Sequence, residues 1–96
     1  MKKLTIYQSE TRSKITLEYI GKVKYVGESF GVDSLTDGMI YNVVKDEKGM
    51  IKIVDDSGED YMYDLINPKP LNNSSPGGKL TIVDDPNGEL AKYING

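Results

Sequence analysis

Two similar acidic phrases are the part of this sequence with the clearest capacity for chemistry. The first, IVDDSGE, begins at residue 53, and the second, IVDDPNGE, begins at residue 82. Calcium takes about six to eight oxygen ligands from a loop of alternating acidic residues, a spacing that neither phrase has. Adjacent strand residues point to opposite faces, so Asp55 and Asp56 are poorly placed to share one ion. A carboxylate beside a turn accepts hydrogen bonds from the next backbone N–H groups. We therefore expect each phrase to form a hairpin, which is a strand, a turn and a returning strand, and we expect no metal site.

Catalysis has few other candidate groups in this chain. The sequence contains no histidine and no cysteine, which removes the most common general base and the best nucleophile. Neither of the glycine-rich phosphate-binding motifs, GxxxxGK[ST] and GxGxxG, occurs. Glycoside cleavage by two carboxylates would need a cleft that separates their pKa values, and a domain of this size has little room for one. We therefore expect neither an enzyme nor a cofactor.

The periodicity of the remaining chain is that of β-strands. From 14 to 20, hydrophobic and polar residues alternate, with Ile15, Leu17 and Tyr19 on one side, as in a half-buried strand. Residues 3–7 alternate in the same way and are expected to pair with this strand. Gly21 interrupts the pattern before it resumes, which indicates a bulge or a sharp bend.

Further strands are expected in the middle and at the end of the chain. Their ranges are 39–45, 50–55, 60–66, 79–84 and 89–94. Tight turns join the first three into a meander, and Asn87-Gly88 favours a hairpin between the last two. No segment carries a helical stripe of ten or more residues. The predicted fold is all-β, with seven or eight short strands that curl into a small barrel.

The bulk composition is that of one small globular domain. The chain has 96 residues, of which 38% are hydrophobic and 28% charged, a balance that excludes a disordered chain. No apolar run approaches the roughly 20 residues that cross a bilayer. The N-terminal region lacks the apolar stretch of a signal peptide, so the expected location is the cytoplasm. With no cysteine, packing must stabilise the fold in place of disulfides.

Three segments carry a resemblance to a known family: KVKYVGE at 22–28, LTDGMIYNV at 35–43 and IVDDSGEDYMY at 53–63. In these segments the chain resembles small, mostly uncharacterised bacterial proteins with a Src-homology-3-like barrel. The resemblance implies a five-stranded barrel in which 28–38 is a long loop, and it implies no enzyme. The expected organisation is an extension of strands (1–21), the barrel (22–66), a linker rich in Pro, Asn, Ser and Gly (67–78) and a C-terminal β-hairpin (79–96), all in one compact unit.

Tyrosine is the unusual residue type of this chain. There are seven tyrosines and no tryptophan, and tyrosine is favoured at binding surfaces because it joins a large contact area to a polar tip. Tyr41 and Tyr61 are expected to fill the core. The first functional hypothesis is a protein-binding surface at the 28–38 loop, used by an unidentified partner or by a second copy. Its residues are Tyr25, Phe30, Asp33, Leu35 and Tyr63.

Uneven charge supports a second hypothesis. The net charge is −3, yet residues 1–27 hold six Lys/Arg against two Glu, and residues 28–96 hold six against thirteen Asp/Glu. The basic first quarter could bind nucleic acid weakly, with Tyr7 or Tyr25 stacking on bases. Its cationic residues are Lys2, Lys3, Arg12, Lys14, Lys22 and Lys24. The acidic remainder argues against broad nucleic-acid binding, so protein binding is the first hypothesis.

Overall fold

The fold is all-β, as predicted. The computed structural model describes residues 3–8, 11–29, 34–68 and 76–94. The strands are β1 (Lys3–Gln8), β2 (Ser13–Gly27), β3 (Ile40–Lys45), β4 (Ile51–Val54), β5 (Asp60–Tyr61) and β6 (Gly78–Asp84), and a short 3₁₀ helix, η1, spans Leu90–Lys92. Over the ranges that the structure describes, no helix combines the length and hydropathy that crossing a membrane requires.

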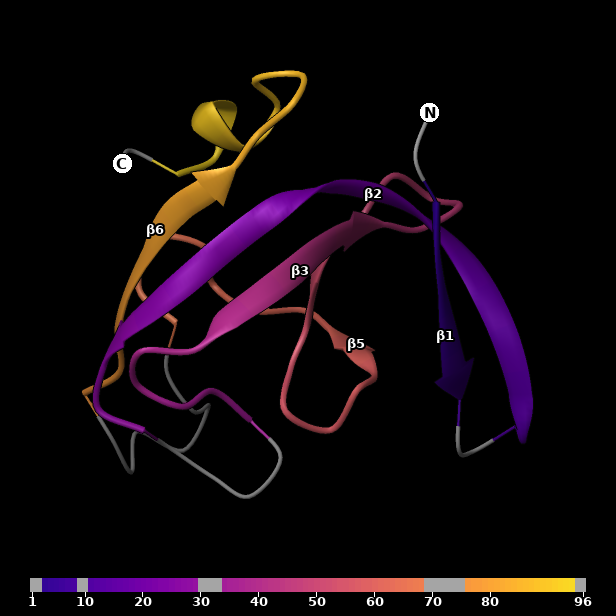
Figure 1. The fold of residues 1–96 in the computed structure, drawn as a ribbon, viewed down its shortest axis with the longest axis horizontal. Helices are drawn as coiled ribbons and strands as arrows, with labels where there is room; N and C mark the ends of the chain where they lie inside the picture. The colour runs from indigo at the N-terminus through magenta and orange to yellow at the C-terminus, as the bar shows by residue number, and fades with distance from the viewer. Residues whose placement is uncertain (1–2, 9–10, 30–33, 69–75, 95–96) are drawn as a thin grey trace.

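The long strand β2 is the centre of one curled antiparallel sheet. The strand order is β1-β2-β3-β4-β5, and β6 also pairs with β2. β1 pairs with residues 13–18 of β2 and β6 with residues 22–27, whereas β3 pairs with residues 18–24. β1 and β6 therefore follow one another along the same edge of β2. Figure 1 shows β2 arching over the molecule, so that the sheet forms a half-barrel of the small Src-homology-3-like kind that was expected.

A β-bulge lets this one strand face two cores. Tyr19 pairs with Val44, and Gly21 pairs with Val43, so the register shifts between Tyr19 and Gly21. Adjacent residues of β3 point to opposite faces of the sheet, and directly paired residues share a face. The odd-numbered residues of β2 therefore change face at the bulge. The interruption predicted at Gly21 is confirmed.

Buried side chains form two clusters. The main core combines strand residues with residues from the loops and the C-terminal segment: Ile20, Val23, Tyr25, Leu35, Tyr41, Val43, Ile53, Leu80, Leu90 and Ile94. The second cluster consists of Ile6, Leu17 and Val44, with Leu4, Ile15 and Val54 packed against it. Because Leu80, Leu90 and Ile94 belong to the main core, the C-terminal segment packs on the barrel instead of extending from it.

Both acidic phrases form turns, as predicted, but only the first turn leads into a returning strand, β5. The N–H of Gly58 donates to the carbonyl of Asp55 at 3.0 Å, and the N–H of Gly88 donates to the carbonyl of Asp85 at 3.1 Å. The φ angles of the two glycines are 82° and 69°, a region that glycine adopts at no steric cost. The carboxylate of Asp55 also accepts the N–H of Ser57 at 3.0 Å. The two phrases thus share the backbone hydrogen bond that closes the turn, but the turn begins at the first aspartate of one phrase and at the second aspartate of the other.

The hairpin predicted at 79–96 is wrong in its second half. Residues after the turn form η1 in place of a strand over 89–94. The carboxylate of Asp85 accepts the N–H groups of Leu90 and Ala91 at 3.0 and 3.1 Å, which turns the chain away from the extended conformation. Leu90 and Ile94 are then 0% and 3% exposed, so burial in the main core outweighs the local hairpin signal.

The strand predicted at 60–66 is also shorter than expected. β5 contains only Asp60 and Tyr61, and the chain then bends where the carboxylate of Asp64 accepts the N–H of Ile66 at 2.9 Å. Within the described residues (3–8, 11–29, 34–68 and 76–94) there are six strands, fewer than the seven or eight expected. The boundary expected between 21 and 22 falls inside β2, so the first strands are continuous with the barrel.

Candidate functional site

The predicted partner surface is only partly described. Phe30 and Asp33 lie outside the described residues. Tyr25 and Leu35 are 0% and 1% exposed and belong to the main core, so they cannot present side-chain surface to a partner. Tyr63 is half-buried and packs against the same core. Among the described residues, the surface expected from sequence is therefore part of the interior.

The buried tyrosines have structural hydrogen bonds instead. The hydroxyl of Tyr41 donates to Asp56 at 2.8 Å, and that of Tyr63 donates to Asp55 at 2.6 Å. Burial, followed by the hydrogen bond to Asp55, raises the pKa of Tyr63 above its ordinary range. The two aspartates of the first phrase are thus held by different donors, which fixes this turn on the barrel. The prediction that Tyr41 fills the core is confirmed, whereas Tyr61 is 48% exposed and the prediction for it is wrong.

A tyrosine also joins the second acidic phrase to β2. The hydroxyl of Tyr19 donates to Asp84 at 2.5 Å. The pKa of Tyr19 is raised from 10.0 to about 12, mainly because the hydroxyl is buried and secondly because it donates to Asp84. After the turn at 85–88, Glu89 forms an ion pair with Lys45 of β3. The acidic residues of this phrase therefore attach the C-terminal segment to the sheet.

Stability at alkaline pH should report the Tyr19–Asp84 contact. Between pH 10 and 12 the unfolded chain loses the Tyr19 proton that the folded chain retains, so the free energy of unfolding falls as pH rises and this contribution is intact below pH 10. Tyr19→Phe should cost about 1.5–3 kcal/mol at pH 8, the value of a hydrogen bond to a charged acceptor. Urea unfolding at pH 8 and pH 11 should show the difference between the two proteins shrinking. A difference that stays constant would contradict the assignment.

The basic first quarter does not form one surface. Lys14 pairs with Tyr7 on the face opposite the second cluster, at one end of β2. Lys22 and Lys24 lie beyond the bulge, where Lys22 pairs with Asn42 on the other face. Lys22 is eight residues after Lys14, which is roughly 26 Å along the strand. The nucleic-acid hypothesis therefore loses the continuous patch that it required; Lys2 lies outside the described residues.

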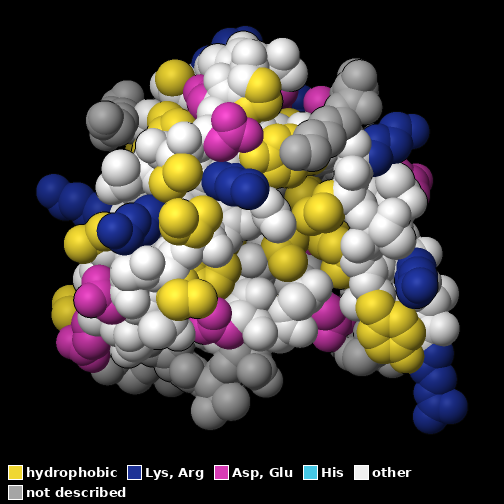
Figure 2. Space-filling view, viewed as in Figure 1, with side chains coloured by type: hydrophobic (Ala, Val, Ile, Leu, Met, Phe, Trp, Pro, Cys, Tyr) yellow, Lys and Arg dark blue, Asp and Glu magenta, His cyan; other side chains and the backbone are white. Residues whose placement is uncertain are grey.

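The structure instead brings a later lysine, Lys79, near Lys24 on the face that also carries Lys22. Lys24 pairs directly with Ile40 of β3, and Val26 pairs directly with Lys79 of β6. Paired residues and residues two apart on a strand share a face. We call the resulting surface the lysine–aliphatic face; it consists of Lys22, Lys24, Val26, Ile40 and Lys79, all exposed. Figure 2 shows Lys/Arg and hydrophobic side chains next to one another over the region that Figure 1 assigns to β6 and β2.

A cavity of about 400 Å³ opens on the other half of the sheet. It is lined by Ile15, Thr16, Leu17, Asp46, Glu47, Lys48, Lys52 and Asp60. These residues come from the first half of β2, the turn between β3 and β4, β4 itself and β5. Sequence reasoning missed this cavity, because Ile15 and Asp60 are far apart in the chain and only the curl of the sheet brings them together.

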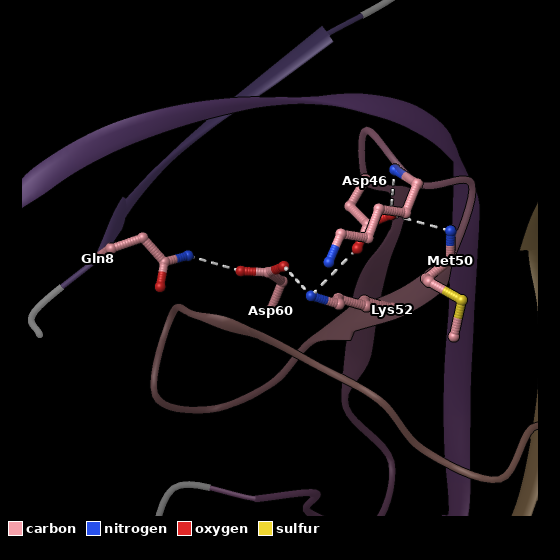
Figure 3. A network of polar contacts seen from close by, with 6 residues as sticks. Gln8, Asp46, Met50, Lys52 and Asp60 are labelled. Carbon is pink, nitrogen blue, oxygen red and sulfur yellow. Dashed lines mark hydrogen bonds and ion pairs between the residues drawn. The ribbon is translucent and has the colours of Figure 1, made fainter. Parts of the chain in front are cut away.

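A polar network crosses one wall of the cavity (Figure 3). Nζ of Lys52 lies 3.3 Å from Oδ2 of Asp46 and 3.5 Å from Oδ2 of Asp60. The side-chain amide of Gln8 donates to Oδ1 of Asp60 at 2.6 Å. Gln8 is on β1 and Asp60 on β5, the two ends of the strand order. The network therefore closes the half-barrel with side chains where no backbone pairing joins its edges among the described residues.

Comparisons of the chain with protein-family models, with curated proteins and with solved structures find no significant match.

Proposed function

We infer that the chain is a non-enzymatic protein-binding module whose contact surface is the lysine–aliphatic face. The observation that carries this proposal is the face itself. It holds three lysines that form no ion pair within the described residues, next to Val26 and Ile40, which are 48% and 51% exposed. Membership of the Src-homology-3-like family and a cytoplasmic, bacterial setting belong to the same proposal.

Charge complementarity defines the partner. The three ammonium groups of this face favour a partner surface rich in Asp and Glu, and the two aliphatic side chains beside them favour an apolar anchor that becomes buried on contact. The one carboxylate paired across this face, that of Asp84 opposite Lys22, already accepts the hydroxyl of Tyr19. The partner is therefore a protein segment in which acidic residues flank an aliphatic side chain.

The same surface is poorly suited to nucleic acid. Proteins that bind single strands stack bases on aromatic side chains, and the members of this face are lysines and aliphatic residues. Tyr7, with 52% exposure, is an exposed aromatic residue from the basic quarter, but it lies at the other end of β2. Nucleic acid therefore remains the second candidate.

A peptide of defined sequence tests the proposal and does not require the natural partner. We expect a ten-residue peptide of alternating glutamate and valine to shift backbone amide NMR signals of Lys24, Ile40 and Lys79, and a lysine–valine peptide of the same length to shift none of them. Lys24→Glu and Ile40→Ser should each weaken binding about tenfold, which is 1.4 kcal/mol. Lys92→Glu and Met62→Ser are matched controls, because both residues are exposed and lie outside the face.

Two outcomes would contradict the proposal. One is equal peptide binding by the face variants and the controls. The other is preferential binding of a single-stranded oligonucleotide of similar charge, with an affinity that falls steeply between 50 and 200 mM salt, as counterion release requires. That result would favour the nucleic-acid hypothesis.

A further inference from the structure

We propose that the cavity between β2 and the β3–β4 turn binds an alkylammonium group. This ligand class is an organic cation with a short aliphatic stem, supplied by a free amine or by an exposed lysine side chain. The site is on a different part of the sheet from the lysine–aliphatic face and uses none of its residues, so the two proposals are independent.

The floor of the cavity fits the aliphatic stem. Ile15 and Leu17 line it, and both belong to the second hydrophobic cluster. Ile15 is half-buried and supplies the apolar surface that a ligand can contact, whereas Leu17 is 4% exposed and belongs to the packed cluster against which Ile15 lies. Figure 2 shows hydrophobic side chains recessed between the regions that β3 and β1 occupy in Figure 1. An aliphatic stem of a few carbons gains roughly 0.8 kcal/mol for each CH₂ group that such a floor removes from water.

The wall of the cavity fits the positive charge. Asp46 and Asp60 share one ammonium, that of Lys52. Their side chains are only 16% and 4% exposed, so little water compensates the second carboxylate. The separation of 3.5 Å between Lys52 and Asp60 exceeds the 2.7–2.9 Å of a strong charged hydrogen bond. The neutral donors on these carboxylates, the Gln8 amide on Asp60 and the N–H groups of Lys48 and Met50 on Asp46, add no positive charge. Two negative charges therefore face the one positive charge of Lys52, and a second ammonium would balance the difference.

The other charged groups that line the cavity do not change its net negative charge. Glu47 and Lys48 are exposed neighbours on the β3–β4 turn and cancel one another. The hydrogen bond from the N–H of Met50 is the main cause that lowers the pKa of Asp46, so this carboxylate is ionised at neutral pH. The cavity wall then carries one net negative charge beside an apolar floor.

The volume limits the ligand to a small molecule or one side chain. About 400 Å³ is near the lower end of the range for ligand sites, roughly 300–1,000 Å³. A mono- or diamine with four or five carbons, or a lysine side chain, fits these limits. We expect a dissociation constant of about 1–10 mM for the simplest amine, since so few atoms supply the contact.

An NMR titration with n-butylammonium tests the proposal. The amide signals of Leu17, Lys48 and Asp60 should move and saturate. Three control compounds should bind at least tenfold more weakly: n-butanol has no charge, n-butyrate has a negative charge, and ammonium chloride has no aliphatic stem. Nα-acetyl-lysine methylamide separates the two sources of the group. Tighter binding than n-butylammonium indicates a lysine side chain, and tighter binding of 1,4-diaminobutane indicates a free amine.

Two isosteric variants make the charge argument falsifiable. Asp46→Asn and Asp60→Asn retain the side-chain shape and each remove one negative charge, so each should weaken n-butylammonium binding about tenfold. Glu28→Gln is the matched control, because Glu28 is exposed and follows the far end of β2. Circular dichroism first establishes whether the variants fold. If they do not fold, the comparison of n-butylammonium with its control compounds on the wild-type protein still tests the proposal. Equal binding of n-butanol, or no saturable shift at 50 mM n-butylammonium, would overturn the proposal.

Discussion

Gly21→Ala is expected to lower the free energy of unfolding by about 3 kcal/mol or more, a large part of the roughly 5–15 kcal/mol of a small domain. A Cβ at this position would lie 2.2 Å from the carbonyl oxygen of Asp84 and 2.5 Å from Cδ1 of Leu90. Asp84 belongs to β6, which is hydrogen-bonded to β2, so its carbonyl cannot retreat without loss of strand pairing. Urea unfolding followed by circular dichroism measures the effect.

Gly38→Ala is the matched control for this prediction. Gly38 has a φ of 82°, and a Cβ there meets no heavy atom within 4 Å. Alanine at Gly38 should therefore cost only the backbone conformational penalty, about 1–2 kcal/mol. Gly21 has no positive φ, so its cost arises from contact alone. Similar losses for the two variants would show that the close approach of β6 to the bulge is not tight.

Features that depend on neighbouring residues were predictable from the sequence. The alternation of Ile15, Leu17 and Tyr19 gave the correct strand and its partner, because a two-residue period specifies which side chains a strand buries. The interruption at Gly21 was also found, since glycine inside a strand pattern marks a bulge or a sharp bend. The aspartate turns at 55–58 and 85–88 follow from local hydrogen bonds.

Features that depend on distant pairing were not predictable. Local signals at Asn87-Gly88 favour a hairpin, but they carry no information about the space beside Gly21 that Leu90 fills. The candidate sites depend on the same kind of contact. Lys79 joins Lys24 only through the pairing of β6 with β2, and Asp60 meets Gln8 only because the sheet curls. The alternation of residues specifies which side chains lie on each face of a strand, but it does not specify which other strand pairs with it.

Leu90→Ala is expected to cost about 3 kcal/mol, within the 2–5 kcal/mol of a leucine truncated in a packed core. Leu90 is 0% exposed and belongs to the main core with Ile94. Val83→Ala, at a position 50% exposed, should cost less than about 0.5 kcal/mol. An equal effect of both changes would mean that the C-terminal segment does not dock on the barrel.

Combining Leu90→Ala with Gly21→Ala separates the two causes of the Gly21 effect. Truncation of Leu90 removes the methyl that would meet the new Cβ at 2.5 Å, but it leaves the Asp84 carbonyl at 2.2 Å. The double variant should therefore be less destabilised than the sum of the single variants, by about 1 kcal/mol, because residues in contact are not additive. Additive losses would mean that the Gly21 effect arises from the β6 backbone alone and that the Leu90 side chain of η1 does not constrain this position. A coupling term instead shows that the bulge glycine and the Leu90 side chain are matched in shape, so this match acts with the Lys45–Glu89 ion pair and the burial of Ile94 to hold the C-terminal segment on the barrel.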